Sequence, residues 1–376
     1  MFENLSHLAL QHYWWAIISL LAALFVFLTF VQGGQTLLFT IGKNEGEKSM
    51  ILNTLGRKWE FTFTTLVTFG GAFFASFPLF YATSFGGAYW VWMIILGAFI
   101  IQAVSYEFRK KPANFLGAKT YEIFLFINGL LGTILIGIAV GTFFNGAEFS
   151  LNVLNQVIWQ NPARGLEAVL TFHNVALGLS IFFLARILGL LYFIYTIDSE
   201  TIVARSKRNL LHNSVIFLVF FLYFVIWLLL KNGFAVNPET GEVVMEKYKY
   251  LNNLLQMPLV LIIFIVGVAG VLWGLISTLF FNGKKGFAFS GPGTVLTVFA
   301  LFIIAGFNNT AFYPSVVHLQ SSLTIQNASS SHFTLVTMSY VSLLVPFVFA
   351  YIYYFWKVMN RKKVTEEELN EQSHVY

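Results

Sequence analysis

The stretch from Arg57 to Lys111 constrains the fold more than any other part of the chain. It begins with Arg-Lys-Trp-Glu and continues through residues 61–85 without a charged side chain. Two adjacent glycines follow, then a second apolar run, and the stretch closes with Glu-Phe-Arg-Lys-Lys. Because about 20 apolar residues suffice for a helix to cross a bilayer, this pattern predicts a membrane hairpin whose two arms hold their charged groups at the same end.

The composition extends this conclusion to the whole chain. Apolar residues make up 57% of the 376 positions and charged residues 10%, with a mean hydropathy of +0.73. A soluble domain carries about 25% charged residues, so lipid must surround most of this chain. The sequence lacks the alternating pattern of membrane β-strands, which favours helices over a β-barrel. It has no cysteine, which excludes disulfides, thiolate metal sites and iron–sulfur clusters.

The apolar runs predict an all-α membrane protein with about nine transmembrane helices, arranged as two four-helix groups plus a peripheral ninth helix. We expect a single integral membrane domain followed by a cytoplasmic tail at 357–376. The first run exceeds the roughly 7–15 residues of a signal-peptide core, so we interpret it as a retained helix. The predicted helices lie near 13–41, 61–85, 87–106, 123–147, 168–197, 209–230, 250–282, 293–312 and 333–356.

The basic residues predict the orientation of these spans. Cytoplasmic loops of membrane proteins carry an excess of Lys and Arg, so the N-terminus is expected outside and the C-terminus in the cytoplasm. Clusters of this kind also explain the net charge of +5 without a nucleic-acid partner. On one side of the predicted membrane lie 17 of the 22 Lys and Arg residues, in the segments 43–58, 109–119, 205–208, 284–285 and 357–363.

Glu60, Glu107 and Arg109 are predicted to lie at similar depth on the cytoplasmic side, because the arms of the hairpin are antiparallel. A carboxylate at a membrane edge with polar neighbours can take up protons and pass them on. The alternative is structural: Glu107 and Arg109 pair at a solvated helix end, and Glu60 balances a neighbouring cation. Both interpretations remain open from the residues alone.

Four further polar residues interrupt the apolar runs. Gln32 and Gln35 fall in the inner part of the first span and Gln102 in the inner part of the third. Arg186 is the one cation well inside a run. An arginine there needs a partner, a cavity or a lipid phosphate, unless its long side chain reaches the headgroups.

The histidines predict that the chain holds no metal of its own. Only His173 lies in the interior of a predicted span, near its outer end, and His212 lies at the inner edge of the span at 209–230, so no facing pair at one depth is available for a bis-histidine haem. A His–Met haem remains open. No nucleotide-binding P-loop sequence is present.

The run from Trp59 to Ala82 resembles subunit II of the cytochrome bd-type quinol oxidases. That family shows a Trp-acid pair, then Gly-Gly-Ala, an aromatic-Pro pair and Tyr-Ala, as in Trp59-Glu60, Gly70-Gly71-Ala72, Phe77-Pro78 and Tyr81-Ala82. The segment Tyr106-Glu107-Phe108-Arg109 is similar to the aromatic-acid-aromatic-Arg ending of the family's third helix. The chain length and the nine spans also match.

The chain departs from the family pattern at four positions. Gln32 and Gln35 stand where the first helix of the family usually has two aspartates, and glutamine cannot titrate. Gln102 stands where the family often has arginine. Glu60 replaces the aspartate that follows Trp59, which keeps a carboxylate there. Trp59, Gln102, Arg109 and Arg186 are therefore expected to be structural or pairing residues, whereas Glu60, Glu107, Gln32 and Gln35 are the candidates for a proton pathway.

The resemblance implies a role in a bacterial inner-membrane respiratory complex. It implies a haem-free subunit that stabilises a haem-bearing subunit I, where quinol is oxidised and oxygen reduced to water at haems b and d. It also implies a possible path for cytoplasmic protons, with small accessory subunits, lipid or quinone as further partners. Two alternatives are a secondary transporter and a quinone-binding anchor of another respiratory complex.

Overall fold

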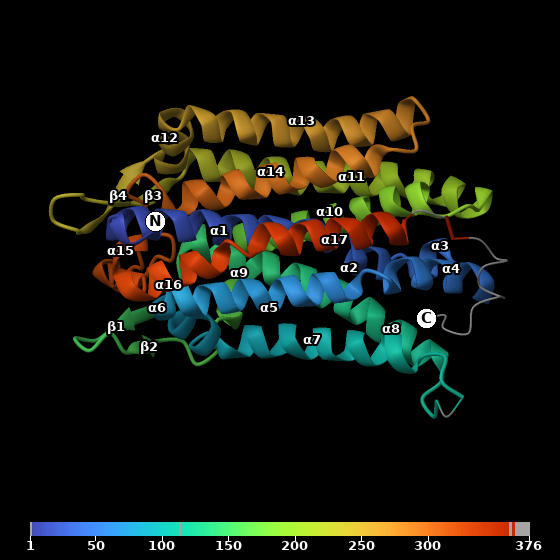
Figure 1. Cartoon of the computed structure of the whole chain (residues 1–376), viewed down its shortest axis with the longest axis horizontal. Helices are drawn as coiled ribbons and strands as arrows, with labels where there is room; N and C mark the ends of the chain where they lie inside the picture. The colour runs from blue at the N-terminus through green and yellow to red at the C-terminus, as the bar shows by residue number, and fades with distance from the viewer. Residues whose placement is uncertain (1, 113, 361–362, 365–376) are drawn as a thin grey trace.

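The chain folds into an elongated bundle of helices that run along one long axis (Figure 1). The computed structural model describes residues 2–112, 114–360 and 363–364. Within these residues, eight helices are long and apolar enough to cross a membrane, and a ninth span results if one bent pair of helices is counted. The predicted all-α membrane fold is confirmed, whereas the grouping into two sets of four stays a prediction.

The spans follow the apolar runs of the sequence. They are α1 (His7–Leu28) continued by α2 (Phe30–Gln35), α5 (Trp59–Ser76), α7 (Tyr89–Phe108), α8 (Ala118–Ile127) continued through the π-helical turn Asn128–Gly132 into α9 (Thr133–Asn145), α10 (Phe172–Thr196), α11 (Glu200–Leu230), α13 (Pro258–Phe280), α14 (Gly286–Gly306), and α16 (His332–Ser342) followed by α17 (Val345–Met359).

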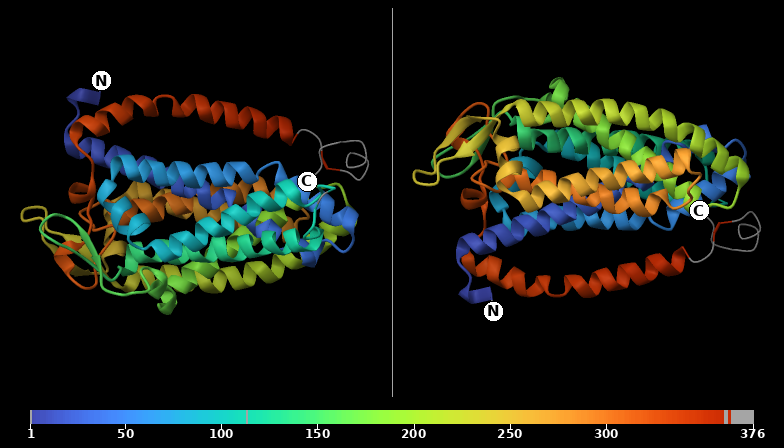
Figure 2. Two further views of the ribbon diagram at one scale, coloured as in Figure 1. Left: turned by 90° about the horizontal axis from the view of Figure 1, so that it is seen from below. Right: turned by 90° about the horizontal axis from the view of Figure 1, so that it is seen from above.

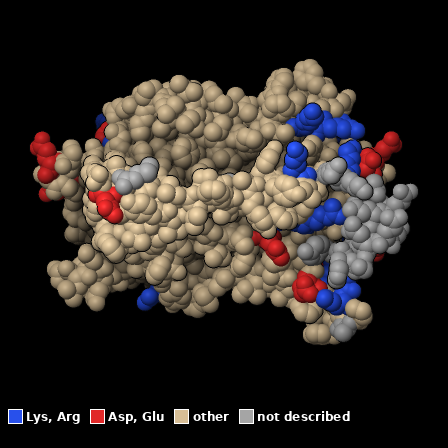
Figure 3. Space-filling model, viewed as in Figure 1, with Lys and Arg blue, Asp and Glu red and all other residues tan. Residues whose placement is uncertain are grey.

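The two ends of the bundle differ in the elements that close them. One end, here the hairpin end, has two antiparallel β-hairpins and the short helices α6, α12 and α15 (Figure 1). The other, here the basic end, has α3 and α4, and Lys and Arg gather there (Figure 3). The short elements are α3 (Leu38–Ile41), α4 (Glu45–Gly56), α6 (Pro78–Phe80), β1 (Phe149–Leu151), β2 (Val157–Trp159), β3 (Asn232–Val236), β4 (Val243–Lys247), α12 (Lys249–Gln256) and α15 (Ile325–Ala328).

Proline and asparagine account for three boundaries that differ from the prediction. The span predicted at 61–85 breaks at Phe77, because Pro78 disfavours a helical conformation at the residue before it, and the chain bends there by 117°. The span predicted at 250–282 divides at Met257 before Pro258 for the same reason. The span predicted at 293–312 runs instead over Gly286–Gly306 and ends before two asparagines with positive φ, at 308 and 309.

Other differences arise because hydropathy detects lipid contact rather than helix ends. The helix predicted at 209–230 begins at Glu200, nine residues earlier, where the Ser199 hydroxyl caps it. The run predicted as one helix at 13–41 is divided at Thr29 and Leu37. Shifts of a few residues occur at 87–106, 123–147, 168–197 and 333–356. Most of the predicted tail at 357–376 lies outside the described residues.

The helix α4 is a further element that the hydropathy pattern missed. The Asn44 side chain accepts a hydrogen bond from the Glu47 amide at 2.8 Å, and the Glu47 carboxylate accepts one from the Lys43 amide at 2.8 Å. These reciprocal bonds satisfy amides that a helix start would leave unpaired. The spacing Asn44-x-x-Glu47 is therefore a readable signal for the start of α4.

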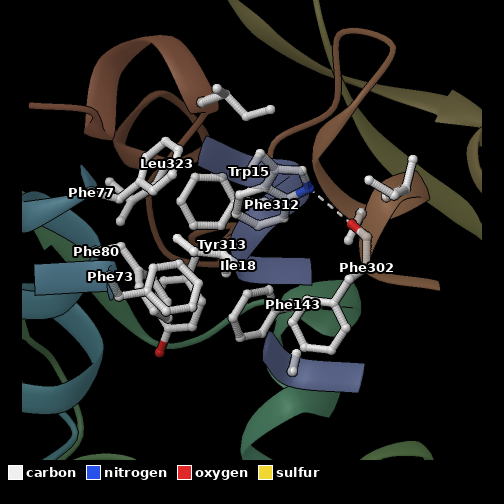
Figure 4. Close-up of a cluster of buried hydrophobic side chains, with 14 of the residues drawn as sticks. Trp15, Ile18, Phe73, Phe77, Phe80, Phe143, Phe302, Phe312, Tyr313 and Leu323 are labelled. Atoms are coloured by element: carbon white, nitrogen blue, oxygen red, sulfur yellow. Dashed lines mark hydrogen bonds between the residues drawn. The ribbon is translucent and has the colours of Figure 1, made fainter. Parts of the chain in front are cut away.

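The core surrounds α10, the most buried of the candidate spans. Gly137 on α9 meets Gly178 on α10 so closely that an added Cβ would lie 2.5 Å from the Gly178 Cα. Such small residues let membrane helices approach each other closely. At the hairpin end, Trp15 is fully buried among aromatic rings from α5, α6, α9 and the loop after α14 (Figure 4). Its indole N–H donates to the Phe302 carbonyl at 3.0 Å.

The last span lies at the edge of the bundle. Figure 2 shows α17 set apart from the other spans along most of its length. Its aromatic contacts with the bundle come from Trp356, whose ring lies 5.9 Å from that of Phe30 and 6.2 Å from that of Phe61. Most of its other apolar side chains are exposed. This helix therefore offers a broad face to lipid or to another chain.

Candidate functional site

A compact group of charged side chains closes the basic end. Arg109, the residue after α7, donates to the Glu122 carboxylate on α8 from Nε at 3.1 Å and from Nη2 at 2.7 Å. Its Nη2 also donates to Glu45 on α4 at 3.1 Å. The Lys48 ammonium donates to Glu122 at 2.9 Å and to Glu45 at 3.1 Å. We call these four residues the ion cluster; they balance two acids with two bases and tie α4, α7 and α8 together.

Burial makes part of the ion cluster sensitive to any loss. The side chains of Arg109 and Glu122 are only 2% and 1% exposed. Removing one member of a buried ion pair leaves an uncompensated charge, which costs about 3–5 kcal/mol. A neighbouring pair, Glu47 on α4 with Arg205 on α11, extends the same bracing to a further span. The ion cluster is thus suited to holding the basic end together.

The predicted proton candidates Glu60 and Glu107 lie outside this cluster. Glu60 is exposed at the start of α5. The Glu107 side chain is 61% exposed and pairs with Lys111 at 2.8 Å. One of the two open interpretations paired Arg109 with Glu107, but its guanidinium instead donates to Glu122 on α8 and Glu45 on α4. Glu60 and Glu107 are therefore accessible carboxylates at the surface of the basic end.

Like Glu45 and Lys48, Glu122 was not among the predicted site residues, although it is the buried carboxylate of the ion cluster. It stands one residue before the apolar run predicted at 123–147, where it resembled an ordinary loop residue. The available signal was the group of three cations at 109–111 in the same predicted loop. A single carboxylate next to an apolar run and opposite such a group is a candidate for a buried ion pair.

A layer of neutral amides lies deeper in the bundle. Gln32 and Gln35 on α2, Gln102 on α7 and Asn128 in the π-helical turn are fully buried. The π-helical turn packs against both α2 and α7. Seven of the eight side-chain amide atoms have no hydrogen-bond partner within the described chain; the exception is the Gln35 nitrogen, which donates to the Tyr106 hydroxyl at 3.1 Å. We call these four residues the amide layer.

Two residues at the start of α5, Lys58 and Trp59, lie between the basic end and this layer. The Trp59 ring stacks on Tyr106 with centroids 5.8 Å apart. The Lys58 side chain is buried, and its ammonium lies 4.8 Å from the centre of a Trp356 ring. In the described part of the chain, neither the Lys58 ammonium nor the Trp59 indole N–H has a hydrogen-bond partner. Polar groups without a hydrogen-bond partner in the described chain are thus found from Lys58 to the amide layer.

Buried amides of this kind need partners. Leaving a buried donor or acceptor unpaired costs about 1–3 kcal/mol, and buried water commonly satisfies such groups. Amides cannot release protons at neutral pH, but they can both donate to and accept from water. The arrangement is therefore chemically suited to orienting a file of water molecules, and it lacks the charge that would trap an ion.

Arg186 lies within α10, as predicted, and its polar partners are neutral. Its Nε donates to the Asn213 side-chain oxygen at 2.7 Å, and its Nη1 donates to the Thr36 hydroxyl at 3.0 Å. No carboxylate of the described chain lies within ion-pair distance. The positive charge therefore has no counter-charge among these residues.

The described histidines are engaged in local contacts. The His173 ring stacks on Trp227 with centroids 3.7 Å apart, and its Nδ1 lies 2.6 Å from the Tyr223 hydroxyl. His7 and His332 each contact a backbone carbonyl, at 3.0 and 2.9 Å. Over the described ranges, no group of three or more His, Asp or Glu residues could hold a metal ion.

Two cavities lie elsewhere in the bundle. A cavity of about 230 Å³ at the hairpin end has both polar and apolar walls and includes Glu148 and Glu167. Burial raises the pKa of Glu167 above its usual range, although hydrogen bonds from backbone amides act in the opposite direction. Just past α11, burial lowers the pKa of Lys231 to about 7. A second cavity of about 130 Å³ is lined by apolar side chains of α1, α10, α11, α13 and α14.

Comparison with known proteins gives a consistent result. A family model described as cytochrome bd terminal oxidase subunit II matches residues 10–359. The chain is similar to the probable cytochrome oxidase subunit 2 of Haemophilus influenzae, at 28% identity over 92% of this chain and 93% of that protein. It is also similar to the cytochrome bd-I ubiquinol oxidase subunit 2 of Escherichia coli K12, at 24% identity over 97% of this chain and 98% of that protein.

A further relative and a solved structure extend the comparison. The cytochrome bd ubiquinol oxidase subunit 2 of Bacillus subtilis is 27% identical over 96% of this chain and 99% of that protein. A chain of the bd oxidase from Geobacillus thermodenitrificans superimposes with a TM-score of 0.64 at 13% identity, over 94% of this chain and 100% of that chain. The structural likeness shows a shared fold.

Proposed function

This chain belongs to the family of cytochrome bd terminal oxidase subunit II, and from that premise we propose that it is the haem-free partner of a haem-bearing subunit I in a quinol oxidase. In this role it packs on subunit I, stabilises it and supplies a route for protons. The observation that carries the proposal is the family match over 10–359 together with a buried, neutral polar layer next to one end of the bundle. The match favours this role over a secondary transporter or an anchor of another complex.

The haem-free role is supported by what the described histidines do. His173 is the one in the interior of a predicted span, and its ring is held between Trp227 and Tyr223. An axial haem ligand needs a ring nitrogen that faces the iron. The partner subunit would supply the haems, the quinol site and the oxygen chemistry.

Docking on subunit I is supported by the apolar faces that the bundle leaves exposed. On α7, Met93, Leu96 and Ile100 are each about half exposed, at 58%, 47% and 51%. The face of α17 is exposed in the same way. Faces of this kind must be covered by lipid or by protein, because they bury no surface within the chain.

The orientation follows the excess of basic residues. We place the basic end in the cytoplasm, so the N-terminus lies outside and α17 returns the chain to the cytoplasmic side. Oxygen reduction to water consumes four protons with four electrons. Protons taken from the cytoplasm for this reaction build a proton gradient without a pumping step.

The amide layer is the part of the chain that we propose conducts these protons. Glu60 and Glu107 collect protons at the cytoplasmic surface. Water near Trp59 and Tyr106 would carry them inward, and the amide layer would orient water beyond that point. The ion cluster stands beside this route, and we assign it a structural role because Arg109 and Lys48 hold the Glu122 carboxylate.

The proposal is tested by purification through an affinity tag on this chain from its native membrane. We expect a stoichiometric partner with haem b and haem d absorption bands and quinol-dependent oxygen consumption. Recovery of the chain without a haem-bearing partner would contradict the assignment. A tagged partner should recover this chain in return, and deletion of this chain should reduce the haem content of the partner.

A further inference from the structure

The apolar cavity inside the bundle has no part in the proposed proton route. Its volume is about 130 Å³, and its walls come from α1, α5, α7, α9, α10, α11, α13 and α14. The lining side chains recur along these helices at spacings of three and four residues, as at Leu177, Ile181 and Leu184 on α10. Residues at this spacing lie on one face of a helix, so each helix turns a single face toward the cavity.

The walls contain almost no polar group that could hold water. Thr294 and Thr297 donate their hydroxyls to backbone carbonyls of their own helix, at 2.8 and 2.9 Å. The Ser180 hydroxyl is buried and has no hydrogen-bond partner in the described chain. A buried water needs about two to four polar partners, whereas an apolar cavity of about 150 Å³ stays dry and takes up xenon or benzene. The cavity is therefore suited to a small apolar molecule.

The cavity reaches the lipid-facing surface where α11 and α13 meet. It is partly open, and Leu222 on α11 is the lining residue with the largest exposed fraction, 51%. Val268 and Leu272, which line it from α13, are half-buried. Leu222 lies eight residues before the end of α11, or about 12 Å along the helix. The opening therefore faces the hydrocarbon of the membrane rather than the headgroups.

The chemistry of the walls favours an occupant that is apolar throughout. None of the described lining residues is charged, so a polar headgroup that entered would lose its hydration without gaining partners. Dioxygen is small and apolar, and like other apolar solutes it dissolves more readily in hydrocarbon than in water. It is also the substrate that the proposed function requires.

We propose that this cavity admits dioxygen from the lipid between α11 and α13 and leads it through the chain toward α5 and α7. Leu66 and Phe69 of α5 and Trp92 of α7 form part of its wall. The exposed face of α7 is one that we assign to docking on subunit I, so the inference rests on the proposed function. Dioxygen then reaches the partner from the membrane core, where it is more concentrated than in water.

Xenon tests whether the cavity takes up an apolar gas. Crystals of the intact complex, pressurised with xenon, should show xenon density inside the cavity. Val140→Phe, which fills part of the interior from α9, should remove this density. Absence of xenon from the wild-type cavity would overturn the proposal. Density for an acyl or isoprenoid chain in the cavity would overturn it as well, because the space would then be permanently occupied.

Oxygen kinetics test whether the cavity is a route. Val268→Trp narrows the opening and should raise the KM for oxygen by about threefold, with kcat at saturating oxygen and haem content unchanged. Val266→Trp is the matched control, because Val266 is 52% exposed on α13 and does not line the cavity. Val268 is half-buried at the edge of the bundle, so its variant keeps the test valid if Val140→Phe fails to assemble.

Two results separate failure of this inference from failure of the proposed function. A wild-type KM for oxygen in both Val268→Trp and Val140→Phe complexes with full haem content would overturn oxygen entry and leave the subunit assignment intact. Isolation of the chain without a haem-bearing partner would overturn the assignment itself, and the oxygen route with it.

Discussion

The ion cluster and the amide layer are two polar regions that adjoin each other on α7 and follow opposite rules. Tyr106, which meets the amide layer, and Arg109, in the ion cluster, are three residues apart, or about 4.5 Å along the helix. In the ion cluster each charged group has an oppositely charged partner at 2.7–3.1 Å. In the amide layer, seven of the eight side-chain amide atoms have no hydrogen-bond partner within the described chain. This difference is the reason that we assign a structural role to the ion cluster and proton conduction to the amide layer.

The energetic cost of an unpaired buried group explains why the ion cluster is fully paired and the amide layer is not. A buried charge without a counter-charge costs several kcal/mol, so the ion cluster is stable only when complete. An unpaired amide costs about 1–3 kcal/mol, which internal water can offset. A paired carboxylate has its proton site occupied by a cation, whereas a hydrated amide leaves water free to reorient. We therefore expect substitutions in the first region to affect assembly and those in the second to affect turnover.

The largest effect is expected from Arg109→Met. It would leave Glu122, 1% exposed, with Lys48 as its remaining partner, and should destabilise the basic end by about 3–5 kcal/mol. The yield of assembled complex and its thermal unfolding midpoint in detergent would both fall. A double variant with Glu122→Gln should recover part of the loss. A normal yield of assembled complex from Arg109→Met alone would contradict the expectation that the ion cluster, unlike the amide layer, is required for assembly.

The next effect is expected from Gln102→Leu. Loss of the amide should interrupt the water file and slow oxygen reduction by about tenfold, which corresponds to about 1.4 kcal/mol in the barrier. Assembly and haem content should remain normal. Gln11→Leu is the matched control, because Gln11 is also buried but lies at the hairpin end and donates to Ser329 at 2.6 Å. If the layer is dry, Gln102→Leu would instead stabilise the complex without slowing it.

A smaller effect is expected from Glu60→Gln. Glu60 is exposed and shares the surface with Glu107, so its loss should slow oxygen reduction about twofold, with normal haem spectra. The double variant with Glu107→Gln should be slower than either single one. Turnover equal to wild type in the double variant would reject surface collection by these carboxylates.

The smallest effect is expected from Lys111→Met. Its pair with Glu107 joins side chains that are 52% and 61% exposed, and surface pairs contribute about 0–1 kcal/mol. The unfolding midpoint should stay within about 1 °C of wild type. A shift comparable to that of Arg109→Met would mean that burial does not separate the two kinds of ion pair.

The sequence predicted the membrane spans and the family, because span length, hydropathy and the motifs at 59–82 and 106–109 are local properties. The match over 10–359 confirms the family resemblance. The partner of Arg109 could not be read from the sequence in the same way. Glu122 and Glu45 lie 13 and 64 residues away along the chain, and their meeting depends on how α8 and α4 fold back on α7.

The amide layer shows a second limit. Gln32, Gln35 and Gln102 were identified by their polarity within apolar runs, and their shared depth followed from the alternation of the spans. Asn128 was not singled out, because the π-helical turn that directs it inward leaves no clear mark in the sequence. Its neighbour Gly129 permits the close approach of α2 there, since an added Cβ would lie 2.3 Å from the Gln32 carbonyl oxygen.

Proton uptake in vesicles tests the central claim most directly. Complexes are oriented with the basic end outward, and a pH dye follows external protons by stopped flow as quinol and oxygen react. For the wild type we predict that external protons disappear at the rate of electron transfer. For a Gln32→Leu and Gln102→Leu double variant with full haem content, we predict uptake slowed by about tenfold or more. Uptake at the wild-type rate would contradict the assignment of proton conduction to the amide layer.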